Sequence, residues 1–334
     1  MGQATSCDND EMIDNLVLDG IVTVLDVERA LRLVDRGHFM PDMKPEVVYR
    51  DSPWKSVKGA PGKLHLSAPS MYARVLESLQ FEKGQSFLNV GSGTGWLNTV
   101  VGFLVGSQGI NHGIEVHQNI VDFADGCLVK TLTRPETYAF DWAKPSFKVG
   151  NGLSIRVENF YDRLYIGAGI KEEHIENFVR MIKVGGILVA PVDMELIRIV
   201  RTSDSFTQEV VCHVQFADVI PANGELITDL FPPTDPLSLF GLCLNSIRSI
   251  IREKSLEVKP VAIRSTITPE GRQRRENQRH NFPLMPPQAG AFRRRGDGAR
   301  EGDRGEEEEE REDEEEEGQH GIELAEAVFE MRPV

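Results

Sequence analysis

The chain of 334 residues is long enough for one or two domains with a sizeable core, and its hydrophobic content of 40% is typical of a globular protein. No apolar run reaches the roughly 18–20 residues of a membrane span, and no basic and then apolar leader opens the chain. The four cysteines show no C-x-x-C spacing, which favours free thiols over a disulfide framework or a zinc site, so we predict no metal site.

The net charge of −15 comes mainly from one segment near the C-terminus. Residues 301–317 hold thirteen acids and two arginines, which leaves the other 317 residues with a net charge of only −4. Residues 252–300 hold twelve basic and five acidic side chains. A basic block followed by an acidic block is typical of disordered chain, so we expect 259–334 to be mostly disordered. No aromatic platform accompanies the basic residues, and we expect no nucleic-acid partner.

The chain begins with MGQATSC, which matches a pattern for lipid attachment. Gly2 after the initiator methionine, with Ser6 as the sixth residue, fits N-myristoylation. Cys7 is a candidate for a second acyl chain, which stable membrane binding requires. The alternative is an unmodified, flexible N-terminus over residues 1–9. We expect a cytoplasmic protein that reaches a membrane surface through these acyl groups.

Helices are predicted in the first forty residues, most clearly over Thr23–Val34, where apolar residues recur with helical periodicity. Four prolines make 41–66 irregular, and a helix is predicted over Pro69–Leu79 with proline in its first turn. An alternation of strands and helices follows. Strands are predicted at 86–90, 111–116, 146–149, 161–166 and 186–191, and helices at 96–105, 118–131 and 171–183.

Residues 196–219 contain two β-rich runs that predict an antiparallel hairpin at the sheet edge. Together these elements predict an α/β domain over 10–222. The sequence FPPTDP at 231–236 then breaks the chain, and an apolar helix is predicted from Leu237 to Ile251, inside a helical segment that spans 228–258. A further short helix is predicted at 322–330.

The most informative stretch is SFLNVGSGTG at 86–95, where an apolar strand meets a glycine-rich turn. This geometry brings backbone N–H groups close to a nucleotide-like ligand. Three glycines alternate with Ser92 and Thr94, namely Gly91, Gly93 and Gly95. The dinucleotide fingerprint G-x-G-x-x-G is absent, and the spacing suits a smaller adenosyl ligand such as S-adenosylmethionine. Glu115 lies twenty residues past Gly95, where a carboxylate can accept hydrogen bonds from ribose hydroxyls. The alternative is an ordinary glycine-rich turn.

Several segments together resemble the protein-L-isoaspartate O-methyltransferases over roughly residues 10–220. The resemblance is carried by DRGHF (35–39), HLSAP (65–69), FLNVGSGTGWL (87–97), GIEVH (113–117), VGNG (149–152), YDRLYIGAG (161–169) and VGGILVAPV (184–192). The start MGxxxS, the motif NxGSGTG and the C-terminal extension are similar to a divergent branch, the isoaspartate methyltransferase domain-containing proteins. The resemblance implies a Rossmann-like, S-adenosylmethionine-dependent methyltransferase fold, a three-layer α/β sandwich.

The resemblance also implies a reaction, in which a methyl group moves to the α-carboxylate of an isoaspartyl residue in a protein or peptide. That carboxylate is already ionised at pH 7, so alignment in a water-poor pocket matters more than a strong base. Ser67 of the S-A-P motif would contact the substrate carboxylate, or alternatively cap the helix near Pro69. The glycine loop would hold the methionine part of the cofactor, Glu115 the ribose, and Asn151 the adenine edge.

Three departures from the family pattern bear on activity. Asn89 and Asn151 stand where the family has acids, and His65 stands where active members tend to have threonine. Losing a buried carboxylate partner costs on the order of 1–3 kcal/mol. With Leu66, His65 belongs to the predicted substrate shell, where a bulky imidazole would block or redirect the substrate. We therefore expect cofactor binding to be retained and family turnover to be impaired.

The predicted C-terminal helix carries a second pattern, S-L-x-x-x-C-x-x-x-I at 238–247, which looks like the elongin-binding box of suppressor-of-cytokine-signalling proteins. Leu239, Cys243 and Ile247 are four residues apart, so they form one apolar stripe that can dock into a partner groove. The alternative is a core helix packed on the domain. FPLMPP at 282–287 is a weak candidate for the cullin-contacting motif, since it departs from the usual L-P-x-P.

These patterns leave three hypotheses. The first is an adaptor that binds S-adenosylmethionine, recognises isoaspartate-damaged proteins and recruits elongin B/C and a cullin ubiquitin ligase. The second is an active protein-L-isoaspartate O-methyltransferase. The third is a methyltransferase for another protein carboxyl group or a small molecule. The departures at Asn89, Asn151 and His65 favour the first, while Ser67 and the glycine loop keep the second open.

Overall fold

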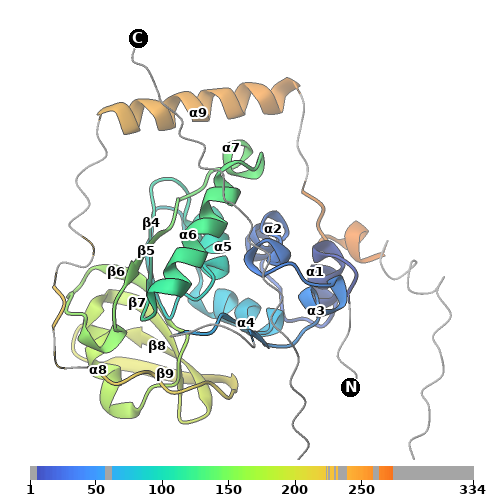
Figure 1. Cartoon of the computed structure of the whole chain (residues 1–334). Helices are drawn as coiled ribbons and strands as arrows, with labels where there is room; N and C mark the ends of the chain where they lie inside the picture. The colour runs from blue at the N-terminus through green and yellow to red at the C-terminus, as the bar shows by residue number, and fades with distance from the viewer. Residues whose placement is uncertain are drawn as a thin grey trace, which may run out of the picture. The chain divides into compact units, whose positions relative to one another are not determined.

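The computed structural model describes residues 6–56, 62–222, 224, 226–228, 231, 239–258 and 263–273. Its centre is a seven-stranded sheet with strand order β5-β4-β3-β6-β7-β8-β9 (Figure 1). The five strands from β5 to β7 pair in parallel, and β8 and β9 add an antiparallel hairpin. The strands are β3 (Ser86–Val90), β4 (Ile110–Glu115), β5 (Ser146–Val149), β6 (Tyr161–Ile166), β7 (Ile182–Val192), β8 (Glu195–Arg201) and β9 (Phe206–His213). The predicted parallel sheet and its edge hairpin are confirmed.

Helices cover both faces of this sheet, as the three-layer prediction requires. The helices are α1 (Asn9–Leu18), α2 (Leu25–Leu33), α3 (Pro45–Val48), α4 (Pro69–Leu79), α5 (Trp96–Val105), α6 (Gln118–Leu132), α7 (Glu136–Ala139), α8 (Glu172–Met181) and α9 (Leu239–Val258). Helices α1, α2, α4, α5 and α6 share one hydrophobic core with one face of the sheet, and α8 packs on the other face. None of the described helices combines the length and apolar character needed to cross a bilayer.

Two boundaries differ from the prediction for a physical reason. Helix α8 ends at Met181, and strand β7 begins at Ile182, inside the range predicted as helix. Ile182 pairs with Tyr161 of β6, so sheet pairing takes over there from local helix preference. The stretch predicted as irregular, 41–66, contains helix α3 and a two-stranded hairpin of β1 (Trp54–Lys55) and β2 (His65–Leu66). The 3₁₀ turn η1 (Arg36–Phe39) comes just before it.

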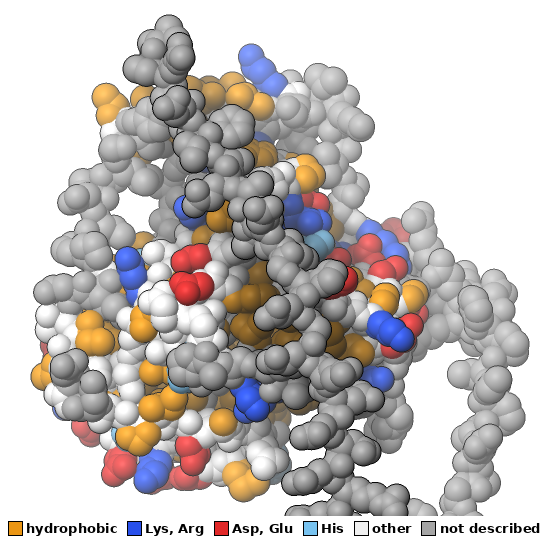
Figure 2. All heavy atoms as spheres, in the orientation of Figure 1, with side chains coloured by type: hydrophobic (Ala, Val, Ile, Leu, Met, Phe, Trp, Pro, Cys, Tyr) orange, Lys and Arg blue, Asp and Glu red, His pale blue; other side chains and the backbone are white. Residues whose placement is uncertain are grey.

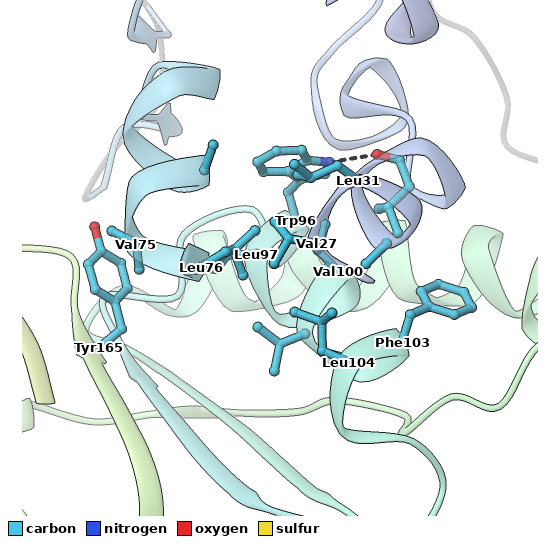
Figure 3. Packing of buried hydrophobic residues seen from close by; sticks show 14 of the residues in the cluster. Val27, Leu31, Val75, Leu76, Trp96, Leu97, Val100, Phe103, Leu104 and Tyr165 are labelled. Carbon is cyan, nitrogen blue, oxygen red and sulfur yellow. Dashed lines mark hydrogen bonds between the residues drawn. The ribbon is translucent and has the colours of Figure 1, made fainter. Parts of the chain in front are cut away.

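Trp96 anchors the N-terminal helices to the sheet. Its side chain is fully buried, and its indole Nε1 donates a hydrogen bond of 2.9 Å to the carbonyl oxygen of Val34, just after α2 (Figure 3). The ring of Tyr72 packs edge-on against it with centroids 5.2 Å apart. One side chain at the start of α5 therefore joins α2, α4 and the glycine turn into a single core.

The residues just before α1 belong to the folded domain, although a flexible segment was predicted over 1–9. Ser6 is buried, and its hydroxyl accepts a hydrogen bond from Asn15. Asp8 caps α1 by accepting a hydrogen bond from the backbone N–H of Glu11. Cys7 is exposed and its thiol donates to the carboxylate of Glu11, which raises the pKa of the thiol. Gly2 lies outside the described residues, so acylation stays a prediction.

Residues 263–273, which we name the docked segment, have a defined place on the domain although they lie inside the range expected to be mostly disordered. Thr266 is buried against α1 and α2, and its backbone N–H donates to Glu28 at 2.6 Å. Arg32 lies at the centre of the same network, within 2.8 Å of three carboxylates, those of Asp10, Asp14 and Glu28. Arg264 pairs with Asp14 as well. The chain thus returns to its own N-terminal helices. The helix predicted at 322–330 lies outside the described residues.

Thr266→Val should destabilise the protein although the two side chains have nearly the same shape. The Thr266 hydroxyl donates to Asp14 and accepts from Arg32 at 3.1 Å, and both partners are buried. Leaving these groups unsatisfied should lower the free energy of unfolding by about 1–3 kcal/mol in urea titrations. Thr207→Val on the exposed face of β9 is the matched control and should change it by less than about 0.5 kcal/mol. Equal effects of the two variants would contradict the docking.

His112 of β4 should make stability depend on pH. Its buried ring stacks on Phe231 and its Nδ1 lies 2.9 Å from the Tyr161 hydroxyl, and burial lowers its pKa from 6.5 to about 4. Between these values only the unfolded chain takes up the proton, so stability falls as the pH drops. From pH 7.5 to pH 5 this histidine should account for a loss of about 2 kcal/mol. Urea unfolding of wild type and His112→Gln at both values measures it, and an undiminished loss in the variant would refute it.

Candidate functional site

A cavity of about 700 Å³ lies at the carboxyl ends of β3, β4 and β6, beside the loop that follows β5. In a parallel sheet these ends meet at one edge. From β3 the chain adds β4 and β5 on one side and then β6 and β7 on the other, and the cavity lies at this change of side. The loop from β2 into α4 and the stretch 215–220 line the cavity as well. The described residues contain no cluster of three or more His, Cys, Asp and Glu side chains that could hold a metal ion.

The glycine turn after β3 forms one wall of the cavity. Gly91 and Gly93 line it, and both adopt positive φ angles, 79° and 53°. The backbone N–H groups of Gly91 and Ser92 donate to the carbonyl oxygen of Ile114 at 2.8 and 2.9 Å, which folds the turn back onto β4. A Cβ atom at position 93 would lie 3.3 Å from the carbonyl oxygen of His65. A bare backbone therefore lets β2 approach the turn.

Glu115 ends β4 with its carboxylate at the cavity wall. Oε2 accepts a hydrogen bond from the N–H of Gly93 at 3.3 Å, and Oε1 accepts from the N–H groups of Val116 and His117 at 2.9 and 3.3 Å. Three backbone donors thus fix the orientation of an acid that is only 8% exposed. An oriented carboxylate with remaining lone pairs is suited to accept hydrogen bonds from a ribose diol.

Five residues predicted for the cofactor or substrate do not line the cavity. Asn89 faces α5, where its amide donates to Asn98 at 2.7 Å. Gly95 packs against Phe147, whose ring lies 2.7 Å from where a Cβ would stand. Ser92, Thr94 and Leu66 are buried beside the wall. These side chains build the turn and its support, and only the backbone at 91 and 93 reaches the ligand space.

Asn151 lines the cavity, but its side chain is engaged with the protein. The amide nitrogen donates to the carbonyl oxygens of Ile220 and Pro221 at 2.9 and 3.1 Å, and the amide oxygen accepts from the N–H of Leu153. Both amide protons are therefore committed to holding 220–221 against the loop after β5. Other atoms of this loop would therefore have to make any contact with an adenine edge.

Ser67 and His65, at the end of β2 and the loop after it, also line the cavity. Ser67 does not cap α4, because the capping position is Ala68 and the helix has no side-chain cap. Its backbone is fixed instead, with the carbonyl accepting from buried Arg36 at 2.8 Å and the N–H donating to the Tyr72 hydroxyl at 3.4 Å. Desolvation, together with the charges of Lys55 and Arg36, lowers the pKa of His65, so its ring is neutral at pH 7.

Sequence patterns missed several lining residues. Tyr72 and Tyr165 present phenol rings to the cavity, but in the sequence both look like ordinary core aromatics of α4 and β6. Residues 215–219 were predicted as part of the edge hairpin, but β9 ends at His213, and the stretch 215–220 lines the cavity without regular structure. It is held by Gly169, whose N–H donates to Ala217 and whose carbonyl accepts from Val219, both at 2.8 Å. The glycine-rich YIGAG segment was the available signal for this contact.

The residues of the cavity fit an adenosyl ligand. The backbone of Gly91 and Gly93 leaves room for close approach, Glu115 offers an oriented carboxylate, and Ile114 and Ile120 supply apolar wall. A mostly apolar cleft with a few fixed polar groups is the usual form of a cofactor site. Ser67, on the loop between β2 and α4, lines the same cavity, which leaves surface for a second ligand.

Known proteins with the same features are protein-L-isoaspartate O-methyltransferases. The enzyme of Arabidopsis thaliana is 33% identical over 188 residues, which are 55% of this chain and 77% of that protein. The enzyme of Ignicoccus hospitalis is 28% identical over 216 residues, which are 63% of this chain and 96% of that protein. These matches share the α/β domain and leave the C-terminal part of this chain unmatched.

Solved structures agree on the fold. A putative protein-L-isoaspartate O-methyltransferase from Plasmodium falciparum, in complex with S-adenosyl-L-homocysteine, has a TM-score of 0.51 and 22% identity, and the match covers 64% of this chain and 99% of that one. A second protein-L-isoaspartate O-methyltransferase has a TM-score of 0.54 and 20% identity, with 65% and 67% covered. The family model of the protein-L-isoaspartate(D-aspartate) O-methyltransferases matches residues 7–224, about two thirds of this chain. The chain belongs to that family.

Proposed function

We propose that this protein transfers a methyl group from S-adenosylmethionine to the free carboxylate of isoaspartyl residues in proteins or peptides. Family membership confirms the predicted cofactor class. The observation that carries the proposal is a single cavity lined by Glu115, the bare glycine turn and Ser67. The active-methyltransferase hypothesis is therefore better supported than the adaptor hypothesis, which the sequence had favoured.

The main contribution of the protein to this reaction is to hold the cofactor and the substrate carboxylate in a reactive orientation. S-adenosylmethionine, when bound, would supply an electrophilic methyl group on its sulfonium sulfur, with the neutral sulfide as the leaving group. Glu115 orients the ribose, and the backbone at Gly91 and Gly93 accommodates the rest of the cofactor. The Ser67 hydroxyl donates a hydrogen bond to the substrate carboxylate and aims one of its oxygens. No general base is needed, because the nucleophile is already ionised at pH 7.

The departures from the family pattern weigh less against activity in this geometry. Asn89 is buried in the sheet and bonded to Asn98, so its replacement of an acid falls outside the cavity. Asn151 uses its side chain to hold residues 220–221 in place. His65 is the departure that faces the ligand space. Its neutral ring would alter which isoaspartyl sequences are accepted without removing a group that the chemistry requires.

Two variants separate substrate positioning from cofactor binding. Ser67→Ala should lower kcat/KM for an isoaspartyl peptide about ten- to hundred-fold, since it removes a donor to a charged oxygen, and should leave the Kd of S-adenosylhomocysteine unchanged. Glu115→Gln should weaken that Kd at least about tenfold, which is about 1.4 kcal/mol. Methyl-transfer kinetics and calorimetry measure both. A wild type that binds the cofactor but never methylates isoaspartyl peptide would rule the proposal out.

A second function, recruitment of elongin B/C and through it a cullin ligase, is favoured by one specific observation. Leu239, Cys243 and Ile247 of α9 are all exposed, with Leu239 78% and Ile247 52% accessible. Figure 2 shows hydrophobic side chains along this helix. This exposure supports groove binding over the alternative of a core helix packed through the stripe. An exposed apolar stripe with spacing four matches helix-in-groove recognition.

The recruitment hypothesis predicts loss of the partner when the stripe is truncated. The double variant Leu239→Ala, Cys243→Ala should reduce co-purification of elongin B/C more than tenfold, because two anchors of the groove contact disappear. Arg248→Ala, an exposed residue about 140° around the helix from Cys243, is the control and should keep the partner. Undiminished capture by the double variant, or no capture by wild type from purified components, counts against this function.

A further inference from the structure

The Tyr165 hydroxyl is a buried polar group at the wall of the cavity that lacks a partner among the described residues. Tyr165 is next to last in β6 and only 1% exposed, and its side chain lines the ligand space. Its ring extends from β6 toward α4, beside Val75 (Figure 3). The hydroxyl makes no hydrogen bond within the described part of the chain. Leaving a buried hydroxyl unsatisfied destabilises the protein, so such a group calls for a ligand that satisfies it.

The neighbour of this hydroxyl is Tyr72, which contacts the proposed substrate residue Ser67. Tyr72 also lines the cavity, and its hydroxyl accepts the hydrogen bond from the N–H of Ser67. Burial raises the pKa of Tyr165, and the nearby Tyr72 raises it further. Burial raises the pKa of Tyr72 as well. Both phenols therefore stay neutral at physiological pH and can act as hydrogen-bond donors.

The guanidinium of Arg36 places a positive charge next to the Ser67 backbone. Arg36 is fully buried and fixes the Ser67 carbonyl, while its second terminal nitrogen has no hydrogen-bond partner among the described residues. Within those residues Arg36 makes no ion pair, although a buried arginine is normally paired with a carboxylate. Arg36 and Tyr72 contact Ser67, and Tyr165 lines the same cavity near Tyr72, so a buried cation and two neutral phenols form a region suited to an anionic acceptor.

We propose that the Tyr165 hydroxyl donates a hydrogen bond to the carboxylate of the bound isoaspartyl group and, together with Ser67, positions its nucleophilic oxygen. This inference rests on the proposed function and names a specificity-determining residue for it. A carboxylate has about four lone-pair sites, so it can accept from Ser67 and Tyr165 at once and still direct one lone pair at the methyl group. Tyr165 then discriminates a carboxylate from a carboxamide, whose NH₂ group cannot accept.

Tyr165→Phe tests the proposal, with Tyr161→Phe as the matched control. Tyr161 lies on the same strand, but its hydroxyl bonds to His112 and it does not line the cavity. Peptide affinity is measured by calorimetry in the presence of S-adenosylhomocysteine, which keeps the test valid if turnover is slow. Tyr165→Phe should weaken binding of the isoaspartyl peptide about ten- to hundred-fold and raise KM accordingly, while the Kd of S-adenosylhomocysteine stays within about twofold.

Thermal unfolding separates this role from a structural one. Tyr165→Phe removes an unpartnered hydroxyl and should leave the Tm equal or higher, whereas Tyr161→Phe loses a buried hydrogen bond and should lower it. Peptide affinity unchanged in Tyr165→Phe overturns the inference. So does a weakened S-adenosylhomocysteine Kd, which would assign the hydroxyl to the cofactor. The proposed function is judged on wild type alone, where binding of S-adenosylhomocysteine without any isoaspartyl peptide binding would overturn both.

Discussion

The site depends on one tight turn, in which the backbone after β3 folds onto the end of β4. Two N–H groups, of Gly91 and Ser92, share the carbonyl of Ile114, and the next glycine N–H reaches the Glu115 carboxylate. Positive φ angles at 91, 93 and 95 make this path accessible to glycine and strained for other residues. The turn starts α5 at Trp96, which in turn secures α2. The cofactor wall and the packing of the N-terminal helices thus follow from the same backbone conformation.

Polar groups near the sheet fall into two classes that sequence position alone does not separate. Asn89, Asn98 and Asn111 form a buried chain of amides between β3, α5 and β4, in which the Asn89 Oδ1 alone has no hydrogen-bond partner among the described residues. The Tyr165 hydroxyl also has no partner there, but Tyr165 lines the cavity and Asn89 does not. The amides stabilise the layer packing, and the Tyr165 hydroxyl is placed where a ligand can meet it. The Asn89 substitution therefore concerns packing between the layers.

The C-terminal part contains one segment packed on the domain and one helix with an exposed apolar stripe. The docked segment returns to α1 and α2, where Thr266 and Glu28 are almost completely buried. Helix α9 lies between this segment and the end of the α/β domain along the chain. Its Arg252 contacts Tyr138 and Asp141, while Leu239, Cys243 and Ile247 are exposed. No residue of α9 lines the cavity, so the two proposed functions use separate residues.

The sequence by itself determined the sheet, its edge hairpin, the glycine turn and the family, because these depend on local periodicity and on residue types at fixed spacing. The glycine spacing and the family resemblance also predicted Gly91, Gly93, Glu115, His65 and Ser67 as site residues, and all five line the cavity. Only the tertiary structure decided that Asn89 faces a helix, that Asn151 holds residues 220–221, and that Thr266 docks on Glu28. Each of these contacts joins residues from separate elements, and where a side chain points depends on what packs against it, which no local pattern records.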